Sequence, residues 1–160
     1  LQDSIPSPKA KKQLTPLEHG AVILHHRGKV LLRQNQPGEW WEGLWDFPRV
    51  QIEIDEGVRD KLPPTKASKT AAPLAVNVLD QISASTCSAL QESFGLECEI
   101  SEFLQTVKHG VTRYSITLFC FEGRPSNDVN RLPGEWKWAS KAELIDLPLT
   151  STAKRLAKDV

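Results

Sequence analysis

Two short apolar runs separated by a turn constrain the fold of this chain more than any other feature. Residues 20–26 read Gly-Ala-Val-Ile-Leu-His-His, and residues 29–34 read Lys-Val-Leu-Leu-Arg-Gln. A short, nearly continuous apolar run of this kind has the character of a buried strand. Arg27 and Gly28 lie between the two runs, and a two-residue connection with glycine is typical of a tight turn. The pattern therefore predicts a β-hairpin.

Further strands and helices are expected along the chain. Residues 37–48 are expected to form a loop with three tryptophans. Apolar and polar residues alternate over residues 50–54, as in a strand with one solvent-exposed face. Residues 78–94 place their apolar side chains approximately on one face of a helix, which Gly95 can cap. The remaining expected elements are a strand pair (99–108 and 113–122) joined through His109-Gly110-Val111-Thr112, a strand at 136–138, a helix opened by the capping box Ser140-Lys141-Ala142-Glu143, and a last helix capped by Thr150 or Ser151. This order predicts an α+β sandwich with a mixed β-sheet between helices.

Two segments have the composition of connections rather than of a core. Residues 1–17 hold three prolines and a lysine run, which predicts a linker, and residues 18–160 are then one domain. Residues 55–77 are polar and contain prolines, which predicts a surface insertion. The chain starts at Leu1 and contains no methionine, so we expect a fragment or a processed chain.

Composition excludes several classes of protein. With 39% hydrophobic and 25% charged residues, the chain is an ordinary globular protein with neither a membrane span nor a signal peptide. We expect it inside the cell, in the cytoplasm or nucleoid if it is bacterial. The three cysteines are widely spaced and form no CxxC pair, so reduced thiols and no metal site are expected. Because the formal net charge is zero, any contact with nucleic acid must come from local patches.

Three segments, in the same order along the chain, resemble the motifs of one family. They are Lys29-Val30-Leu31-Leu32-Arg33 followed by Glu42-Gly43-Leu44-Trp45-Asp46-Phe47-Pro48, then Val107-Lys108-His109-Gly110-Val111-Thr112-Arg113-Tyr114, and then Trp136-Lys137-Trp138 leading to Leu147-Pro148-Leu149. The first is similar to the "LLR…GLWEFP" opening of Nudix-fold domains, and the second to an "RH-x-FSH" loop. Together, over roughly residues 6–158, they resemble the C-terminal domain of MutY-type adenine DNA glycosylases.

The resemblance implies a fold, an activity and partners. The fold would be a Nudix-like α/β/α sandwich with a mixed β-sheet, and the parent enzyme would excise adenine paired with 8-oxoguanine. In that family the catalytic residues and the 4Fe-4S cluster lie in an N-terminal domain that this chain does not contain. The chain would therefore have no catalytic residue and no cofactor of its own. Its expected partners are duplex DNA containing an 8-oxoguanine:adenine pair and its own N-terminal catalytic domain.

The resemblance also implies which residues recognise the lesion. Where the family has Phe-Ser-His, this chain has Val111-Thr112-Arg113, so the hydroxyl is kept while its neighbours change. In 8-oxoguanine, N7 carries a hydrogen and C8 an oxygen, and a threonine hydroxyl both accepts and donates hydrogen bonds. Thr112 would contact the base edge, unless its hydroxyl only bonds the backbone of the turn.

The residues around Thr112 are candidates for contact with DNA. Residues 103–120 contain no acidic side chain but include Lys108, His109 and Arg113, which suits a loop that faces phosphates. Arg113 would contact phosphate or enter the groove, and His109 would orient the loop. Val111 would wedge beside a base step or pack under the loop. Each also has a purely structural alternative, as a solvated or packed side chain.

Two other functions remain open. A Nudix hydrolase of oxidised nucleotides would need a helix with the pattern G-x5-E-x7-R-E-U-x-E-E-x-G-U. Anchored on Gly95 and Leu96, that pattern falls on Leu74, Asp80, Ser88, Ala89, Glu92 and Ser93, and two carboxylates are too few for the oxygen shell of Mg²⁺. A protein-interaction module would use the exposed tryptophans Trp40 and Trp41, whereas Trp45 and Phe47 are expected in the core.

Overall fold

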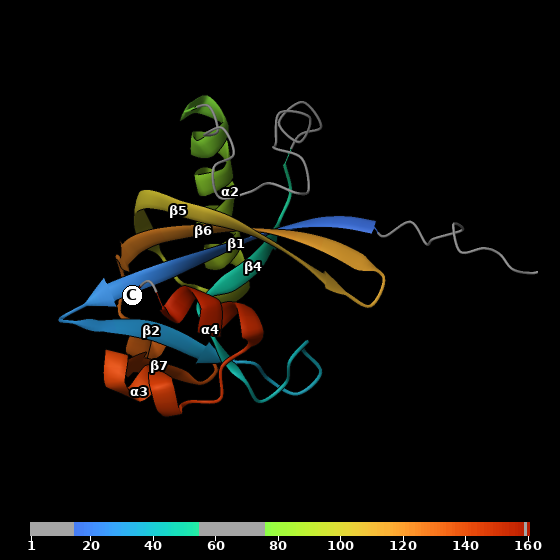
Figure 1. Cartoon of the computed structure of the whole chain (residues 1–160). Helices are drawn as coiled ribbons and strands as arrows, with labels where there is room; N and C mark the ends of the chain where they lie inside the picture. The colour runs from blue at the N-terminus through green and yellow to red at the C-terminus, as the bar shows by residue number, and fades with distance from the viewer. Residues whose placement is uncertain (1–14, 55–75, 159) are drawn as a thin grey trace, which may run out of the picture.

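The computed structural model describes residues 15–54, 76–158 and 160 (Figure 1). Its strands are β1 (Thr15–His26), β2 (Lys29–Gln34), β3 (Trp45–Asp46), β4 (Arg49–Ile52), β5 (Cys98–Val111), β6 (Tyr114–Pro125) and β7 (Trp136–Ala139). Its helices are α2 (Val76–Phe94), α3 (Lys141–Asp146) and α4 (Ser151–Ala157), with a 3-10 turn η1 (Val129–Arg131). Most of the expected linker (1–17) and of the expected insertion (55–77) lies outside the described residues. Residues 15–17 of the expected linker belong to β1, and residues 76–77 of the expected insertion belong to α2.

The strands form one mixed sheet. The seven strands follow the order β3-β2-β1-β6-β5, with β4 paired to β1 and β7 paired to β2. β1 runs parallel to β6, and the other neighbouring strands of the sheet pair antiparallel. The long strand β1 therefore joins both halves of the sheet, because its first part pairs with β4 and β6 and its last residues pair with β2.

The expected hairpin is confirmed. His26 pairs with Lys29 across a two-residue turn, in which Arg27 and Gly28 have φ angles of 52° and 80°. Positive φ at both central positions matches the turn to the right-handed twist of the strands. The tight turn fixes the register of β2, so that Val30 and Leu32 enter the core on one face of the sheet and Leu31 enters the core on the other.

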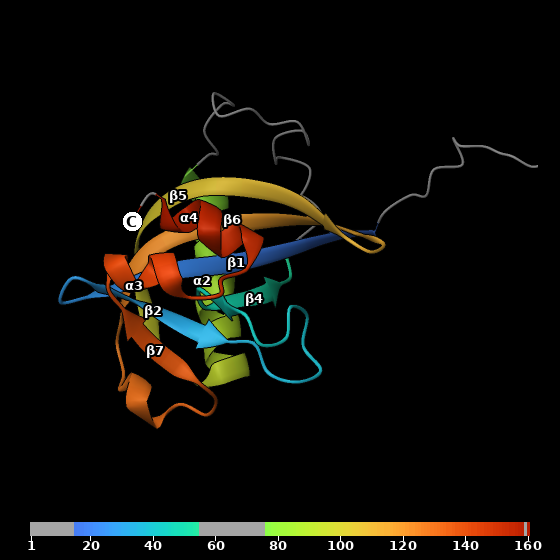
Figure 2. The same cartoon turned by 60° about the horizontal axis from the view of Figure 1, so that its bottom comes forward.

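Helices cover both faces of the sheet (Figure 2). Alternate residues of β1 belong to two cores: Ala21 and Ile23 pack with residues of α3 and α4, whereas Val22 and Leu24 pack with residues of α2. Gly20 lets α2 approach β1 closely, because a Cβ at this position would overlap the side chain of Thr86. The architecture confirms the predicted α+β sandwich with a mixed sheet.

The helix ends follow the sequence signals. Gly95, with φ of 76°, ends α2, and its N–H donates to the carbonyl of Gln91 over 2.9 Å. Ser140 and Glu143 form the expected capping box of α3, and the side chain of Thr150 accepts from the N–H of Ala153 at the start of α4. No helix in the described part of the chain is long and apolar enough to cross a membrane.

The turn between β5 and β6 differs from the expectation. β5 continues through His109, Gly110 and Val111, so only Thr112 and Arg113 lie between the paired residues Val111 and Tyr114. The four-residue connection predicted at 109–112 is therefore wrong in its extent. No Asn-Gly or Asp-Gly pair marks this turn in the sequence, and Thr112 adopts a left-handed φ of 51° that a β-branched residue seldom takes.

Candidate functional site

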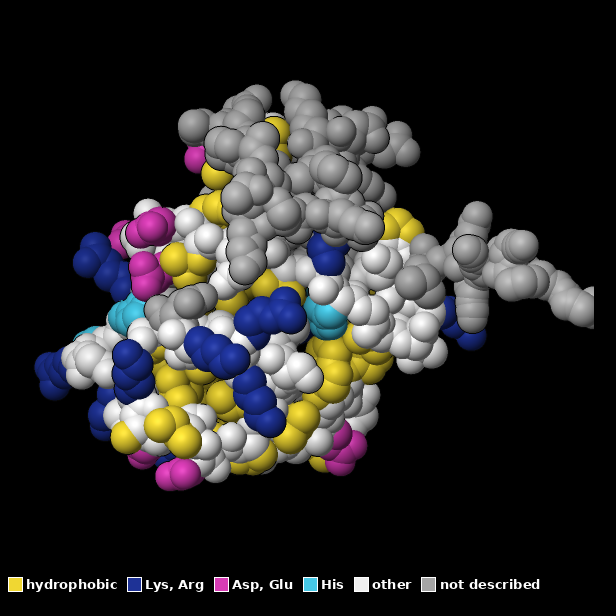
Figure 3. Space-filling model, viewed as in Figure 1, with side chains coloured by type: hydrophobic (Ala, Val, Ile, Leu, Met, Phe, Trp, Pro, Cys, Tyr) yellow, Lys and Arg dark blue, Asp and Glu magenta, His cyan; other side chains and the backbone are white. Residues whose placement is uncertain are grey.

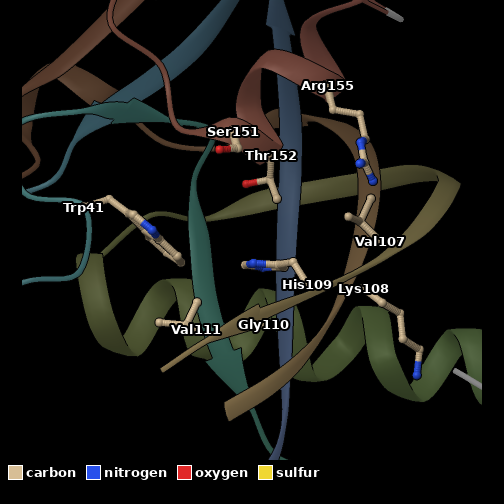
Figure 4. A pocket seen from close by; sticks show the side chains of 9 residues that line it. All are labelled: Trp41, Val107, Lys108, His109, Gly110, Val111, Ser151, Thr152 and Arg155. Carbon is tan, nitrogen blue, oxygen red and sulfur yellow. The ribbon is translucent and has the colours of Figure 1, made fainter. Parts of the chain in front are cut away.

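Three segments meet around a pocket on the face that α4 covers. The pocket has a volume of about 220 Å³ and lies between the end of β5, the tryptophan loop (residues 35–44) and α4 (Figure 4). It is lined by Trp41, Val107, Lys108, His109, Gly110, Val111, Ser151, Thr152 and Arg155. Three of the five residues predicted for lesion contact, Lys108, His109 and Val111, therefore lie at one pocket.

The alternation of a strand decides how these side chains point. Val107, His109 and Val111 project from the side of β5 that faces Trp41 and α4, whereas Lys108 projects the other way (Figure 4). Lys108 thus reaches the pocket rim by its backbone and stem rather than by its ammonium group.

The other two predicted residues, Thr112 and Arg113, form the exposed tip of the hairpin that β5 and β6 build (Figure 1). The carbonyl of Arg113 accepts a hydrogen bond of 2.9 Å from the N–H of Thr15, so β1 supports the tip from one side. Among the described residues, nothing bonds the hydroxyl of Thr112. This disagrees with the alternative in which the hydroxyl only caps its own turn.

A buried arginine lies beneath the pocket. Arg49, whose side chain is 7% exposed, donates from Nε to Nδ1 of His19 over 2.9 Å and from Nη1 to Oγ1 of Thr152 over 3.1 Å. Its Nη2 lies 2.7 Å from Nε2 of His109, and because a guanidinium only donates, this imidazole nitrogen accepts. The guanidinium also lies 4.8 Å from the centre of the Trp41 ring. One side chain thus joins β1, β5, α4 and the tryptophan loop.

The electrostatics of this cluster keep both imidazoles neutral. Burial first, and then the charge of Arg49, lower the pKa of His109 to about 4 and that of His19 to about 3. Neutral imidazoles are needed here, because a protonated ring has no acceptor for the guanidinium. Burial also raises the pKa of Asp46 to about 6, although Arg49, 3.8 Å away, opposes this shift. The cluster is therefore sensitive to acid.

The tryptophan loop is held in place from both ends. Arg33 forms two hydrogen bonds to Glu39, of 2.9 and 3.0 Å, and the side chain of Asn35 donates to the carbonyl of Trp41 over 3.2 Å. Trp40 is 41% exposed, and its ring centre lies 5.7 Å from that of Tyr114 on β6. The loop consequently packs against the stem of the hairpin whose tip holds Thr112. Phe47 is buried and Trp45 packs against the core, as expected.

Positive charge gathers on the same face. Lys and Arg side chains cluster over the middle of the view in Figure 3, where α4 lies in Figure 1, while Asp and Glu lie toward its edges. Lys154 and Arg155 belong to the last turn of α4, and both are exposed. A protein with no net charge thus presents one locally basic face.

The described residues on the α2 side of the sheet do not form a metal site. At the positions of the Nudix pattern, Ser88, Glu92 and Ser93 are exposed and Ala89 packs against the core, so Glu92 supplies the one carboxylate near the end of the helix. Within the described ranges no three His, Cys, Asp or Glu side chains group as metal ligands. Mg²⁺ requires several oxygen ligands, and these residues do not fit it.

Sequence reasoning missed part of the site. Arg49, Thr152 and Arg155 were not among the predicted residues, although Arg49 makes the most contacts of the cluster. No local signal distinguishes Arg49 in the sequence, where it is one charged residue directly before the expected strand at 50–54. The other two become visible only when α4 packs beside β5.

Comparison with known proteins places the chain in a family. Residues 19–159 match the family model described as a NUDIX domain. The solution structure of the E. coli ORF135 protein has a TM-score of 0.59 at 21% identity, over 91% of this chain and 88% of that chain. A MutT NUDIX hydrolase from Burkholderia pseudomallei has a TM-score of 0.59 at 16% identity, over 91% of this chain and 98% of that chain.

A third solved structure is the NUDIX domain of Shewanella oneidensis NrtR complexed with ADP ribose, with a TM-score of 0.54 at 19% identity, over 96% of this chain and 90% of that chain. No curated protein matches the chain by sequence. At these identities the solved structures establish a shared fold alone, whereas the family model covers most of the chain. The chain belongs to the NUDIX domain family.

Proposed function

We propose that this domain binds duplex DNA and recognises 8-oxoguanine opposite adenine, as the C-terminal domain of a MutY-type adenine DNA glycosylase. The observation that carries the proposal is the tip of the β5–β6 hairpin. There an exposed threonine hydroxyl, free of partners among the described residues, projects from a turn that β1 supports. The chain itself would perform no bond cleavage.

The chemistry of the lesion matches the group at the tip. The N7–H of 8-oxoguanine is a donor that guanine lacks, and the hydroxyl of Thr112 accepts such a bond without bringing a charge. A hydrogen bond to one base edge contributes about 1–3 kcal/mol to discrimination. Arg113 lies next to Thr112 on the same exposed turn and would pair with a phosphate of the lesion strand.

Contacts along the stem of the β5–β6 hairpin favour specific recognition of a base over non-specific contact with DNA. His109 in the stem bonds Arg49, and Tyr114 packs beside Trp40. A recognition group held by a rigid stem loses little conformational entropy when it binds. The stem thus fixes the position of Thr112 relative to the body of the domain.

The basic face supplies the sequence-independent part of binding. Lys154 and Arg155 on α4 are exposed on the face that holds the pocket, and such residues bind phosphates and release counterions. The second proposed partner is the catalytic domain of the same enzyme, for which Trp40, 41% exposed, is the proposed contact.

Titration of the chain with labelled duplexes tests the proposal. Adenine opposite 8-oxoguanine, adenine opposite guanine and an undamaged duplex should be compared at low salt. Tighter binding to the 8-oxoguanine duplex is expected. Equal affinity for all three would contradict lesion recognition and leave a backbone-binding domain.

A second candidate function is hydrolysis of an oxidised nucleoside triphosphate. It is favoured by the family match and by the similarity in fold to a MutT NUDIX hydrolase, and the pocket of about 220 Å³ would be its nucleoside site. The residues of α2 argue against a hydrolase, because Ser88, Ala89 and Ser93 offer no carboxylate to bind the Mg²⁺ that would neutralise a diphosphate.

Incubation with 8-oxo-dGTP and Mg²⁺ separates the two candidates. The recognition proposal predicts no release of pyrophosphate above that of a Glu92→Gln variant. Metal-dependent release that Glu92→Gln abolishes would establish the hydrolase instead.

A further inference from the structure

Two of the three cysteines lie side by side on the α2 side of the sheet. Cys87 belongs to α2 and Cys98 is the first residue of β5, and Sγ of Cys87 lies 3.7 Å from the carbonyl oxygen of Cys98. Both side chains are half-buried, so small reagents can reach them. The third cysteine, Cys120, is buried in the other core, among residues that pack with α4.

The surroundings make the two thiols unequal. A hydrogen bond from the Cys98 thiol stabilises the thiolate of Cys87 and lowers the pKa of Cys87 to about 7, although burial opposes this shift. The same hydrogen bond and burial raise the pKa of Cys98. Burial also raises the pKa of Cys120, to about 12. Cys87 is therefore the more readily ionised and more reactive thiol of the pair, whereas Cys120 is an inert buried thiol.

We propose that Cys87 and Cys98 are a redox modification site, at which a peroxide converts the thiol pair into a reversible disulfide between α2 and β5. The proposal is independent of DNA recognition, because it uses none of the residues of the pocket or of the hairpin tip.

The reaction balances with one peroxide molecule. The Cys87 thiolate attacks one oxygen of hydrogen peroxide, the O–O bond breaks, and Cys87 sulfenic acid and hydroxide form. The hydroxide takes the proton of the Cys98 thiol, giving water. The Cys98 thiolate then attacks the sulfenic sulfur, the S–O bond breaks, and the departing hydroxide is protonated to water. Two thiols are oxidised by two electrons in total, and the two peroxide oxygens are reduced.

The disulfide would tether the end of α2 to an edge strand. The closed loop runs from Cys87 to Cys98 and includes Gly95, which ends the helix. β5 is the last strand in the order of the sheet, so in the described part of the chain it pairs with β6 alone. A cross-link at this place restricts the unfolded chain and stabilises the folded one. The oxidised protein should therefore melt several degrees above the reduced protein.

Peroxide treatment of the reduced chain tests the proposal without any variant. After oxidation, denaturation, alkylation of free thiols and digestion, mass spectrometry should find the Cys87 and Cys98 peptides joined, with the loss of two hydrogen atoms. Dithiothreitol should reverse the link, and Cys120 should be recovered alkylated. Cys87 as sulfinic acid beside alkylated Cys98, two alkylated thiols, or a disulfide between chains would each overturn the proposal.

Two variants test the order of the steps. Cys98→Ser should accumulate Cys87 sulfenic acid, which dimedone traps, because the second thiol is missing. Cys120→Ser is the matched control and should form the Cys87–Cys98 link at the wild-type rate. Dimedone labelling that is absent in Cys98→Ser, while circular dichroism shows a folded chain, would contradict the assignment of Cys87 as the first thiol to react.

Discussion

Nη2 of Arg49 on β4 lies 2.7 Å from Nε2 of His109 on β5, a contact between residues 60 positions apart in the chain. The same guanidinium bonds His19 on β1 and Thr152 on α4. These bonds set the stem of the β5–β6 hairpin relative to the sheet and to the basic helix. The position of the hairpin tip, and hence the proposed recognition of the lesion, depends on this cluster.

Replacing Arg49 with methionine should destabilise the domain strongly. Methionine fills much of the volume but leaves the buried Asp46 without its cation and two imidazoles without a donor. The free energy of unfolding should fall by about 3–5 kcal/mol, as when one partner of a buried ion pair is removed. Urea denaturation measures the loss.

A surface arginine provides the control for this substitution. Arg124 is paired with Glu99, but their side chains are 75% and 65% exposed, so Arg124→Met should change the free energy of unfolding by less than about 0.5 kcal/mol. Similar losses for Arg49→Met and Arg124→Met would show that the buried cluster contributes little.

Acid should weaken the cluster through its histidines. The pKa values of His19 and His109 are lowered from 6.5 to about 3 and about 4. The unfolded chain therefore binds protons first, and these two groups cost stability as the pH falls below 6.5. Because burial is the largest cause, the pKa of His109 in Arg49→Met should rise but stay below 6.5. NMR titration of the imidazole nitrogens measures both values, and an ordinary pKa for wild-type His109 would contradict the cluster.

Asp46 should act in the opposite direction. Its pKa is raised from 3.8 to about 6, so between these values the folded state holds the proton more tightly, and this group adds stability as the pH falls. Asp46→Asn removes the compensation and should lose stability more steeply than the wild type between pH 6 and pH 4. Chemical denaturation at a series of pH values tests this, and parallel curves would disagree with the raised pKa.

Thr112 should store strain in the turn. Its φ of 51° is costly for a β-branched residue and free for glycine. Thr112→Gly should therefore raise the free energy of unfolding by about 1 kcal/mol, while Thr112→Ser should stay near the wild type. Lower stability of Thr112→Gly in thermal or urea unfolding would argue against a strained turn.

The basic face should determine the salt dependence of DNA binding. Lys154→Gln and Arg155→Gln should each lower the slope of log affinity against log salt by about 1 if the residue neutralises one phosphate. Arg131→Gln is the matched control, because this side chain on η1 is 86% exposed and already paired with Asp128. Equal changes for all three variants would mean that charge alone, rather than its position, matters.

The sequence predicted those elements whose signals are local. The turn at Arg27-Gly28, the glycine that ends α2 and the capping box at Ser140 each depend on a few adjacent residues. The parallel pairing of β1 with β6 joins segments about a hundred residues apart, such as Thr15 with Tyr114, and no local pattern specifies such a register. The extent of the β5–β6 turn was missed for a related reason, because strand pairing holds Thr112 in a conformation that its own preference disfavours.

Only part of the candidate site could be predicted from the sequence. Lys108, His109 and Val111 were found because they lie together in one non-acidic stretch of sequence. Arg49 and Thr152 belong to the same cluster, but they reach it from β4 and α4, and Arg49 looks in the sequence like an ordinary charged residue at the start of a strand. Burial gives Arg49 its role, and burial follows from tertiary packing.

The most direct test of the central claim is the ratio of affinities for the 8-oxoguanine and guanine duplexes, measured for the wild type and for three variants of Thr112. Wild type and Thr112→Ser keep the hydroxyl and should prefer the 8-oxoguanine duplex, whereas Thr112→Ala and Thr112→Gly should lose roughly tenfold of that preference, or about 1.4 kcal/mol. Their binding to the guanine duplex should be unchanged. A preference that survives unchanged in Thr112→Ala and Thr112→Gly would contradict the assignment of Thr112 as the group that recognises the lesion.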